Sequence, residues 1–180
     1  MIWEEETILD FLDLCQYSIY GDVFSFAIRT GMRRSEICGL KWDAVDLVKG
    51  KLRVERTLYD INGHGLVTDE PKTKKSKRTI ILGEGTINLL HSIRGNQLKL
   101  GLPTTGYVFS KPDGSPIVPN KVTAEFTRFI REHNLPKMNF HGLRHCFATL
   151  SLLAGIDSKV VSESLGHSTF AITFVLYQHV

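Results

Sequence analysis

Three absences limit what this 180-residue chain can be. It has no apolar run near the ~20 residues that a membrane-spanning helix needs. Its first residues include Glu4, Glu5 and Glu6, where a signal peptide would carry positive charge and then an apolar stretch. It also lacks a strong excess of one charge, because 22 Lys and Arg stand against 19 Asp and Glu. We therefore expect a cytoplasmic protein that does not act at a membrane. A formal charge of +3 is compatible with nucleic-acid binding but does not argue for it.

Cysteine is scarce as well. Cys15, Cys38 and Cys146 are an odd number of widely spaced residues, each within an apolar helical pattern. This usage favours buried free thiols over a disulfide or a metal site. The chain has no internal repeat, low-complexity tract or linker, and its length suits a single domain with one sizeable core.

Apolar spacing predicts that most of the chain is helical. Start and stop signals such as Gly31, Gly155 and Gly166 bound several of the expected helices. The expected helices are Glu4 to Gln16, Val23 to Ile28, Arg34 to Leu40, Ile87 to Ile93, one capped by Asn120, His141 to Leu153, one capped by Asp157, and one capped by Ser168 that carries Tyr177.

A short β region interrupts the helices near the front of the chain. Lys51 to Leu58 alternates apolar and polar residues, and Asn62-Gly63 is a turn signal. Gly65 to Asp69 and Arg78 to Leu82 would complete a small antiparallel sheet. The predicted fold class is α+β, mainly helical, with a small three-stranded antiparallel sheet.

Four segments carry side chains suited to phosphate chemistry. In Thr-Gly-Met-Arg-Arg-Ser-Glu, Gly31 ends one helix and Arg33 stands at the mouth of the next. Free backbone N–H groups and a guanidinium fork there could together hold an anion, with Glu36 orienting a neighbouring cation. Taken alone, Arg33 would more simply be a surface residue beside a helix turn.

The second segment is Pro-Lys-Thr-Lys-Lys-Ser-Lys-Arg, from Pro71 to Arg78. A run of this kind is usually a solvated turn. It could instead reach onto a phosphate backbone, and Lys72, Lys74 or Lys75 could donate a proton to a departing oxygen.

The third segment is His-Gly-Leu-Arg-His. On a helix, His141 and Arg144 share a face and would point at the same spot. A rival interpretation takes His141 and His145 as metal ligands with His167, but Gly142 replaces the glutamate of the zinc-protease pattern.

The fourth segment runs from Leu-Gly-His-Ser to the carboxyl end. His167 lies between a helix-ending glycine and a helix-capping serine, and Tyr177 follows ten residues later. A tyrosine with an ordinary pKa of about 10 needs a base or nearby positive charge to act as a nucleophile. Ten residues of straight helix span about 15 Å, so Tyr177 would reach the same phosphate through a bend, by moving on binding, or in a neighbouring protomer.

These motifs, in this order, resemble the catalytic domain of the tyrosine recombinases, or phage-type integrases. The resemblance covers nearly the whole chain and is nearest to the integrases of phages and conjugative transposons. It implies the fold of the DNA breaking-rejoining enzymes, with residues 1–180 as one catalytic domain. The amino-terminal DNA-binding domains usual in the family are absent from this chain, which is expected to be an excised domain.

The resemblance also implies a role for each candidate residue. Arg33 and Arg144 would clamp the non-bridging oxygens of the scissile phosphate, and His167 would add a third hydrogen bond. His141 would act as acid and base near the nucleophile. Lys72 would be the general acid toward the leaving 5′ oxygen, and Tyr177 would form a 3′-phosphotyrosyl bond.

The expected partner is double-stranded DNA, bound by a tetramer of the full-length enzyme, whereas this piece alone should be monomeric. No metal, ATP or other cofactor is expected in the reaction. The enzyme would serve a mobile genetic element of a bacterium or phage and integrate or excise DNA.

Three alternatives remain open from the sequence. A type IB topoisomerase uses a similar residue set, although such enzymes tend to have lysine where His141 stands. A DNA-binding module that has lost catalysis would keep the basic residues for holding phosphates. A metal hydrolase would use His141, His145 and His167.

Overall fold

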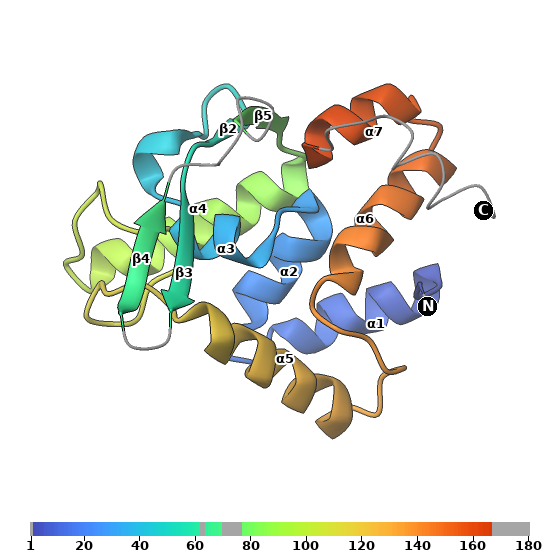
Figure 1. The fold of residues 1–180 in the computed structure, drawn as a ribbon, viewed down its shortest axis with the longest axis horizontal. Helices are drawn as coiled ribbons and strands as arrows, with labels where there is room; N and C mark the ends of the chain where they lie inside the picture. Colours follow the sequence, from blue (N-terminus) through green and yellow to red (C-terminus); the bar gives the residue numbers. More distant parts are fainter. Residues whose placement is uncertain (1, 62–63, 70–76, 167–180) are drawn as a thin grey trace.

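The structure, a computed structural model, describes residues 2–61, 64–69 and 77–166 (Figure 1). These residues form seven α-helices, one short 3₁₀ turn and five strands. In chain order, the elements are α1 (Glu5–Cys15), α2 (Gly21–Thr30), α3 (Arg34–Gly39), the 3₁₀ turn (Trp42–Ala44), β1 (Val45–Asp46), β2 (Lys51–Val54), β3 (Thr57–Ile61), β4 (Gly65–Asp69), β5 (Arg78–Ile81), α4 (Glu84–Lys99), α5 (Pro119–Glu132), α6 (Gly142–Leu153) and α7 (Ser158–Leu165).

The expected helices within the described residues are confirmed, with one correction at a cap. Asp157 caps α7 as predicted, because its Oδ1 accepts a hydrogen bond from the backbone N–H of Lys159 at 2.8 Å. Asn120 does not cap α5, which begins one residue earlier at Pro119, after Val118. Proline suits this first helical position because its φ is already helical and its missing N–H would have no partner there. The helix predicted to start at Ser168 lies outside the described residues.

The β region forms two antiparallel sheets where one was expected. The three-stranded sheet has the order β1-β2-β5, and β3 pairs with β4 in a separate two-stranded sheet. The strand predicted over Lys51 to Leu58 is in fact two strands, interrupted at Glu55 and Arg56.

The interruption coincides with an ion pair formed by Arg56. Arg56 turns outward and donates two hydrogen bonds to the Asp43 carboxylate, at 2.7 and 2.9 Å. Thr57 is one of the polar residues of the alternating run, but it is buried together with Leu58. Its hydroxyl donates to the carbonyl of Asp69, so the alternation of faces does not continue across the break. The turn predicted at Asn62-Gly63 lies outside the described residues.

The core is centred on a cluster of aromatic rings between α1, α2 and α5. Phe24 and Phe126 lie 5.3 Å apart between ring centroids, and Phe126 lies 5.5 Å from Phe140. Phe11 and Phe129 extend the same cluster, with centroids 5.8 Å apart. Edge-to-face contacts of this kind stabilise beyond the area they bury. They anchor α2, whose carboxyl end leads into the pocket described below.

Figure 1 shows α6 and α7 to one side of α2. Helix α6 lies beside α2, and α7 lies across the far end of α6, near β5. Ala148 of α6 and Val161 and Leu165 of α7 form a small apolar cluster of their own. The end of α7 is therefore held close to the end of α2.

The three cysteines are free thiols in buried positions, as expected. Burial raises the pKa of both Cys15 and Cys38 to about 12. Among the described helices, none has both the length and the apolar character needed to cross a membrane.

Candidate active site

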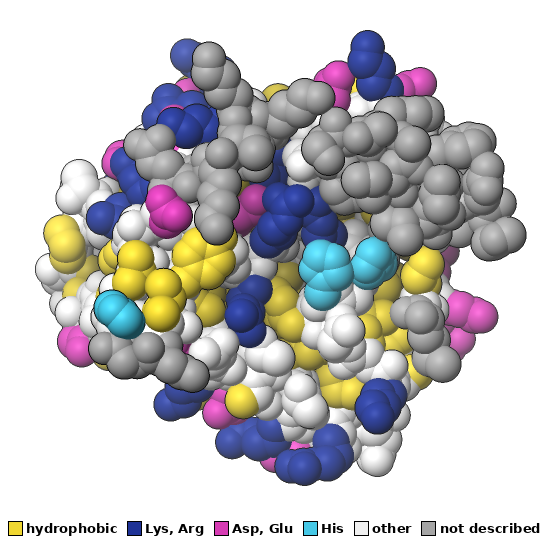
Figure 2. All heavy atoms as spheres, in the orientation of Figure 1, with side chains coloured by type: hydrophobic (Ala, Val, Ile, Leu, Met, Phe, Trp, Pro, Cys, Tyr) yellow, Lys and Arg dark blue, Asp and Glu magenta, His cyan; other side chains and the backbone are white. Residues whose placement is uncertain are grey.

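A cavity of about 350 Å³ opens where α3, β3, α5 and α6 meet. Arg33, His141 and Arg144, three of the six predicted site residues, line it together. The other lining residues are Met32, Arg34, Ser35, Tyr59, Thr123, Asn139 and Phe140. Figure 2 shows one face of the molecule, and near its middle Lys and Arg side chains lie beside two neighbouring histidines.

The turn at Gly31 sets the position of Arg33. Gly31 has a φ of +62°, in the left-handed region that glycine tolerates best. A Cβ here would come within 2.4 Å of the Phe147 ring and 2.8 Å of Leu165, so the close approach of α6 and α7 also requires glycine. Gly31 thus ends α2 in a conformation and a space that suit glycine, and Arg33 follows at the entrance of α3.

One backbone donor at the start of α3 is already in use. The N–H of Arg33 donates to Glu36 Oε2 at 2.8 Å, so the chain itself uses this donor. The guanidinium also donates to Glu36 Oε1, at 2.9 Å, which confirms that Glu36 orients a neighbouring cation. The Arg33 side chain nevertheless stays 39% exposed, so its charge faces the cavity.

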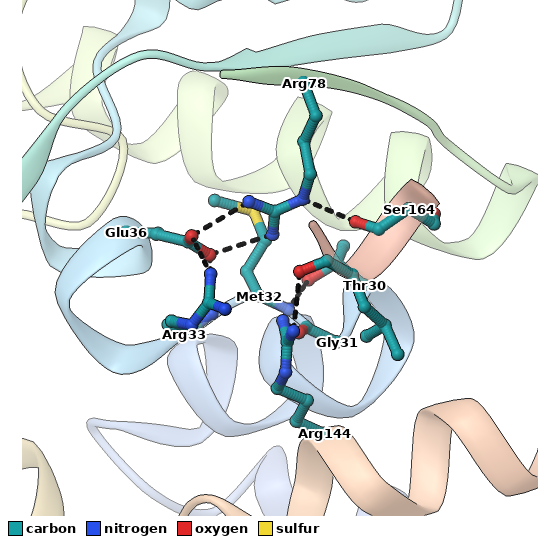
Figure 3. Close-up of polar contacts among 9 residues, drawn as sticks. Thr30, Gly31, Met32, Arg33, Glu36, Arg78, Arg144 and Ser164 are labelled. Carbon is teal, nitrogen blue, oxygen red and sulfur yellow. Dashed lines mark hydrogen bonds and ion pairs between the residues drawn. The ribbon is translucent and has the colours of Figure 1, made fainter. Parts of the chain in front are cut away.

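Glu36 is the centre of a buried ionic cluster (Figure 3). Its carboxylate is 2% exposed and accepts hydrogen bonds from both Arg33 and Arg78. Burial alone would raise the pKa of Glu36, but the hydrogen bonds and charges of Arg78 and Arg33 outweigh burial and hold this pKa below its ordinary value. One carboxylate thus serves two guanidinium groups, which leaves the cluster with excess positive charge.

Arg144 is held differently. It is buried, and its two terminal nitrogens donate to the carbonyls of Gly31, at 2.7 Å, and of Leu165 (Figure 3). These carbonyls belong to the residue that ends α2 and to the last residue of α7. They orient the guanidinium, which lies beside Arg33 at the cavity.

His141 stands directly before α6 and remains exposed. Partial loss of solvation lowers the pKa of its imidazole, and the positive charges of His145, Arg144 and Arg33 lower it further. At neutral pH the ring is therefore in its neutral form, which can accept a proton.

Lys72, His167 and Tyr177 lie outside the described residues, as do the alternative lysines Lys74 and Lys75. Their predicted roles stay predictions. His167 follows Gly166 directly in sequence, and Gly166 ends α7 with a φ of +67°. Lys72 precedes Arg78, the first residue of β5, by six positions.

Two residues near the cavity were not singled out from the sequence. Asn139 accepts a hydrogen bond from the N–H of Gly142 at 2.9 Å and so stabilises the start of α6 beside His141. Asn139 lies two residues before His141, the N-cap of α6, so the residue preference at N-caps does not predict this contact. Arg34 donates to the hydroxyl of Thr123 and ties α3 to α5. Nothing in the local sequence predicts that contact.

The rings of His141 and His145 lie 4.9 Å apart between centroids, in an edge-to-face arrangement. Two of the three residues proposed as metal ligands in the rival interpretation therefore lie together. Among the described residues, no group of three His, Cys, Asp or Glu side chains could hold a metal ion. His167, the third residue of that hypothesis, lies outside them.

The described residues form a mainly helical domain in which two guanidinium groups and a histidine line one cavity. The model of the phage integrase family matches residues 3–180, and the chain belongs to this family. A curated relative, the tyrosine recombinase XerC-like protein of Caldanaerobacter subterraneus subsp. tengcongensis, is 34% identical over 88% of the chain. The transposase from transposon Tn916 of Enterococcus faecalis is 25% identical over 98% of it.

The fold matches solved structures over the whole chain. The integrase of the Tn1549 transposon, in complex with transposon right end DNA, aligns with a TM-score of 0.88 and 26% identity, and the alignment covers 100% of this chain and 62% of that one. XerA recombinase, at 22% identity and a TM-score of 0.78, shares the fold. The chain spans 45% of the length of the XerC-like relative and 46% of the Tn916 transposase.

Proposed function

We propose that this chain is the catalytic domain of a site-specific DNA recombinase that cuts and rejoins a phosphodiester through Tyr177. The observation that carries the proposal is the meeting of Arg33, Arg144 and His141 around one cavity of about 350 Å³. Two guanidinium groups at one site match the charge that phosphoryl transfer builds on the non-bridging oxygens. The family and the relatives' names point to the same chemistry.

In the proposed reaction, the phenolic oxygen of Tyr177 attacks phosphorus as the bond from phosphorus to the 5′ oxygen breaks. His141 takes the phenolic proton, since its lowered pKa keeps the imidazole neutral near pH 7. Lys72 donates a proton to the leaving 5′ oxygen. Arg33 and Arg144 hold the non-bridging oxygens, together with His167.

The product of this step is a 3′-phosphotyrosyl ester and a free 5′ hydroxyl. The ester retains the energy of the broken bond, so a 5′ hydroxyl from a second duplex can reverse the reaction without ATP or a metal ion. Strand exchange needs several protomers on DNA, and we propose a tetramer of the full-length enzyme and a monomeric state for this domain alone. The family's amino-terminal domains would supply most of the DNA affinity.

A trapping experiment tests the proposal. The protein is mixed with a library of nicked random-sequence duplexes, in which cleavage releases a short strand that cannot religate, and is then denatured. We expect a covalent protein–DNA adduct, with the DNA attached to Tyr177 by peptide mapping. The Tyr177→Phe variant lacks the attacking oxygen and should give none, while it binds the same duplexes with unchanged affinity.

Other results would point to the alternatives. Salt-dependent DNA binding without any adduct would identify a DNA-binding module. An adduct accompanied by relaxation of supercoiled plasmid, without strand exchange between duplexes, would identify a topoisomerase. An activity that a chelator abolishes would contradict the metal-free reaction.

A further inference from the structure

Arg78 closes the lysine-rich stretch that the sequence predicts as a solvated turn, yet its side chain is only 5% exposed. It is the first residue of β5 and points away from solvent toward α3 and α7 (Figure 3). None of the roles described above uses it. Burying a guanidinium is costly unless its donors are well paired, so its contacts indicate its role.

The first set of contacts joins Arg78 to Glu36. The two terminal nitrogens of Arg78 donate to the two carboxylate oxygens, at 2.8 and 2.9 Å. Arg33 uses the same two oxygens, one through its guanidinium and one through its backbone N–H. The Glu36 carboxylate therefore accepts four hydrogen bonds, about its full capacity. Arg78 supplies half of them and so restricts the orientation in which Glu36 meets Arg33.

The second set joins Arg78 to the end of α7. Its Nε donates to the carbonyl of Ser164, one of the last carbonyls of the helix, which have no partner within it. A Cβ on Gly166 would come within 3.0 Å of the Arg78 side chain, so this side chain packs directly against that glycine. Arg78 thus holds α3 and the end of α7 in one arrangement.

Arginine suits this position better than lysine. A guanidinium can grip both carboxylate oxygens with one edge and still present Nε to a third acceptor. A lysine ammonium is a single nitrogen and cannot reproduce the paired geometry on Glu36 while also reaching the carbonyl of Ser164.

We infer that Arg78 is a positioning residue for the reaction proposed above: through the shared carboxylate of Glu36, it holds the Arg33 guanidinium in the orientation that meets the scissile phosphate. The inference rests on the proposed function. It predicts that loss of the fork geometry lowers the rate of DNA cleavage without lowering DNA affinity, because Arg78 itself does not line the cavity.

The test is a double-mutant cycle on single-turnover cleavage, with a duplex recovered from the trapping experiment. Arg78→Lys, Arg33→Ala and the double variant are compared with the unaltered protein at saturating DNA, and DNA affinity is measured separately. We expect Arg78→Lys alone to slow cleavage by about 10–100-fold, since small displacements of a positioned group cost this much. Its dissociation constant for DNA should change less than about 3-fold. In the Arg33→Ala background, the same change should slow cleavage less than about 3-fold, because the group that it positions is already gone.

Arg56→Lys is the matched control, since Arg56 also grips a carboxylate, that of Asp43, with two nitrogens but does not line the cavity. It should leave the cleavage rate unchanged. If Arg78→Lys does not fold, Glu36→Gln combined with Arg78→Met removes both charges and leaves no unpaired buried ion in this pair. That variant should show the same loss of rate at unchanged affinity.

Two results would overturn the inference. One is cleavage by Arg78→Lys at the unaltered rate. The other is an equal loss in the presence and absence of Arg33, which would make Arg78 a structural residue only. If the unaltered protein forms no adduct through Tyr177, the proposed function fails, and that result is distinct from both.

Discussion

Two polar networks in this domain differ in their net charge. The Glu36 network (Arg33, Glu36, Arg78 and the carbonyl of Ser164) is ionic and carries more positive than negative charge. The Gln97 network lies on α4 and is neutral. Gln97 Oε1 accepts from the indole N–H of Trp42 at 2.7 Å, and its Nε2 lies 3.0 Å from the carbonyls of Tyr107 and Val108 and the hydroxyl of Ser110.

The difference in charge distinguishes a network that only holds the fold together from one that also presents a charged group at the cavity. The Gln97 network fastens the loop after α4 to the helix, and its bonds end within the protein. The Glu36 network also fastens elements together, but one of its members, Arg33, keeps a partly exposed guanidinium at a cavity. A network with surplus charge costs more to bury than a neutral one. We take the surplus as the mark of a site that receives an anion.

The largest expected effect is on the charged side. Arg33→Ala should slow DNA cleavage about 10²–10³-fold, as the loss of one strong oxyanion donor does. Single-turnover cleavage of a trapped duplex measures it. Arg94→Ala is the control, because Arg94 stacks on Trp42 beside the Gln97 network and donates to the carbonyl of Thr104. The Arg94→Ala variant should cleave DNA at the normal rate. Near-normal cleavage by Arg33→Ala would contradict the link between the Glu36 network and cleavage.

Next in size is a change in the neutral network. Gln97→Leu leaves the buried indole N–H of Trp42 and the neighbouring carbonyls without their partner, so the free energy of unfolding should fall by about 2–4 kcal/mol. Urea denaturation measures the loss. The cleavage rate should not change at temperatures where the variant is folded. Leu98→Gln, at the exposed next position, should shift stability by less than about 0.5 kcal/mol. A Gln97→Leu variant that cleaves DNA slowly but keeps its stability would contradict a purely structural role for the Gln97 network.

The smallest effect is one of pH and is confined to acid conditions. The pKa of Glu36 is lower in the folded protein than its ordinary value of 4.5, so the unfolded chain binds more protons between the two pKa values. Stability should therefore fall as the pH drops below about 4.5 through the folded pKa. Glu36→Gln should flatten this part of the curve, measured as urea midpoints from pH 7 to pH 3. The same curve for Gln97→Leu should keep the slope of the unaltered protein. Equal slopes for the unaltered protein, Glu36→Gln and Gln97→Leu would contradict the claim that Glu36 causes the loss of stability in acid.

Much of this domain was predictable from local signals. Apolar spacing predicted the described helices, and Gly31, Gly166 and Asp157 marked their ends because left-handed turns and helix caps favour these residue types. The sheet was predicted less well. The expected strand is interrupted where Arg56 pairs with Asp43, and a pairing across 13 positions leaves no trace in alternation.

The amino-acid sequence by itself determined the helical segments, the family and the residues offered for catalysis, because each depends on short motifs and their order. Only the tertiary structure decided that Arg33, His141 and Arg144 share one cavity. It also decided that Arg78, expected where a solvated turn leads into a strand, is buried against Glu36 and the end of α7. The physical reason is that the groups packed around a guanidinium decide whether a carboxylate balances its charge. Those groups come from segments as much as 113 positions apart, as with Arg144 and the carbonyl of Gly31.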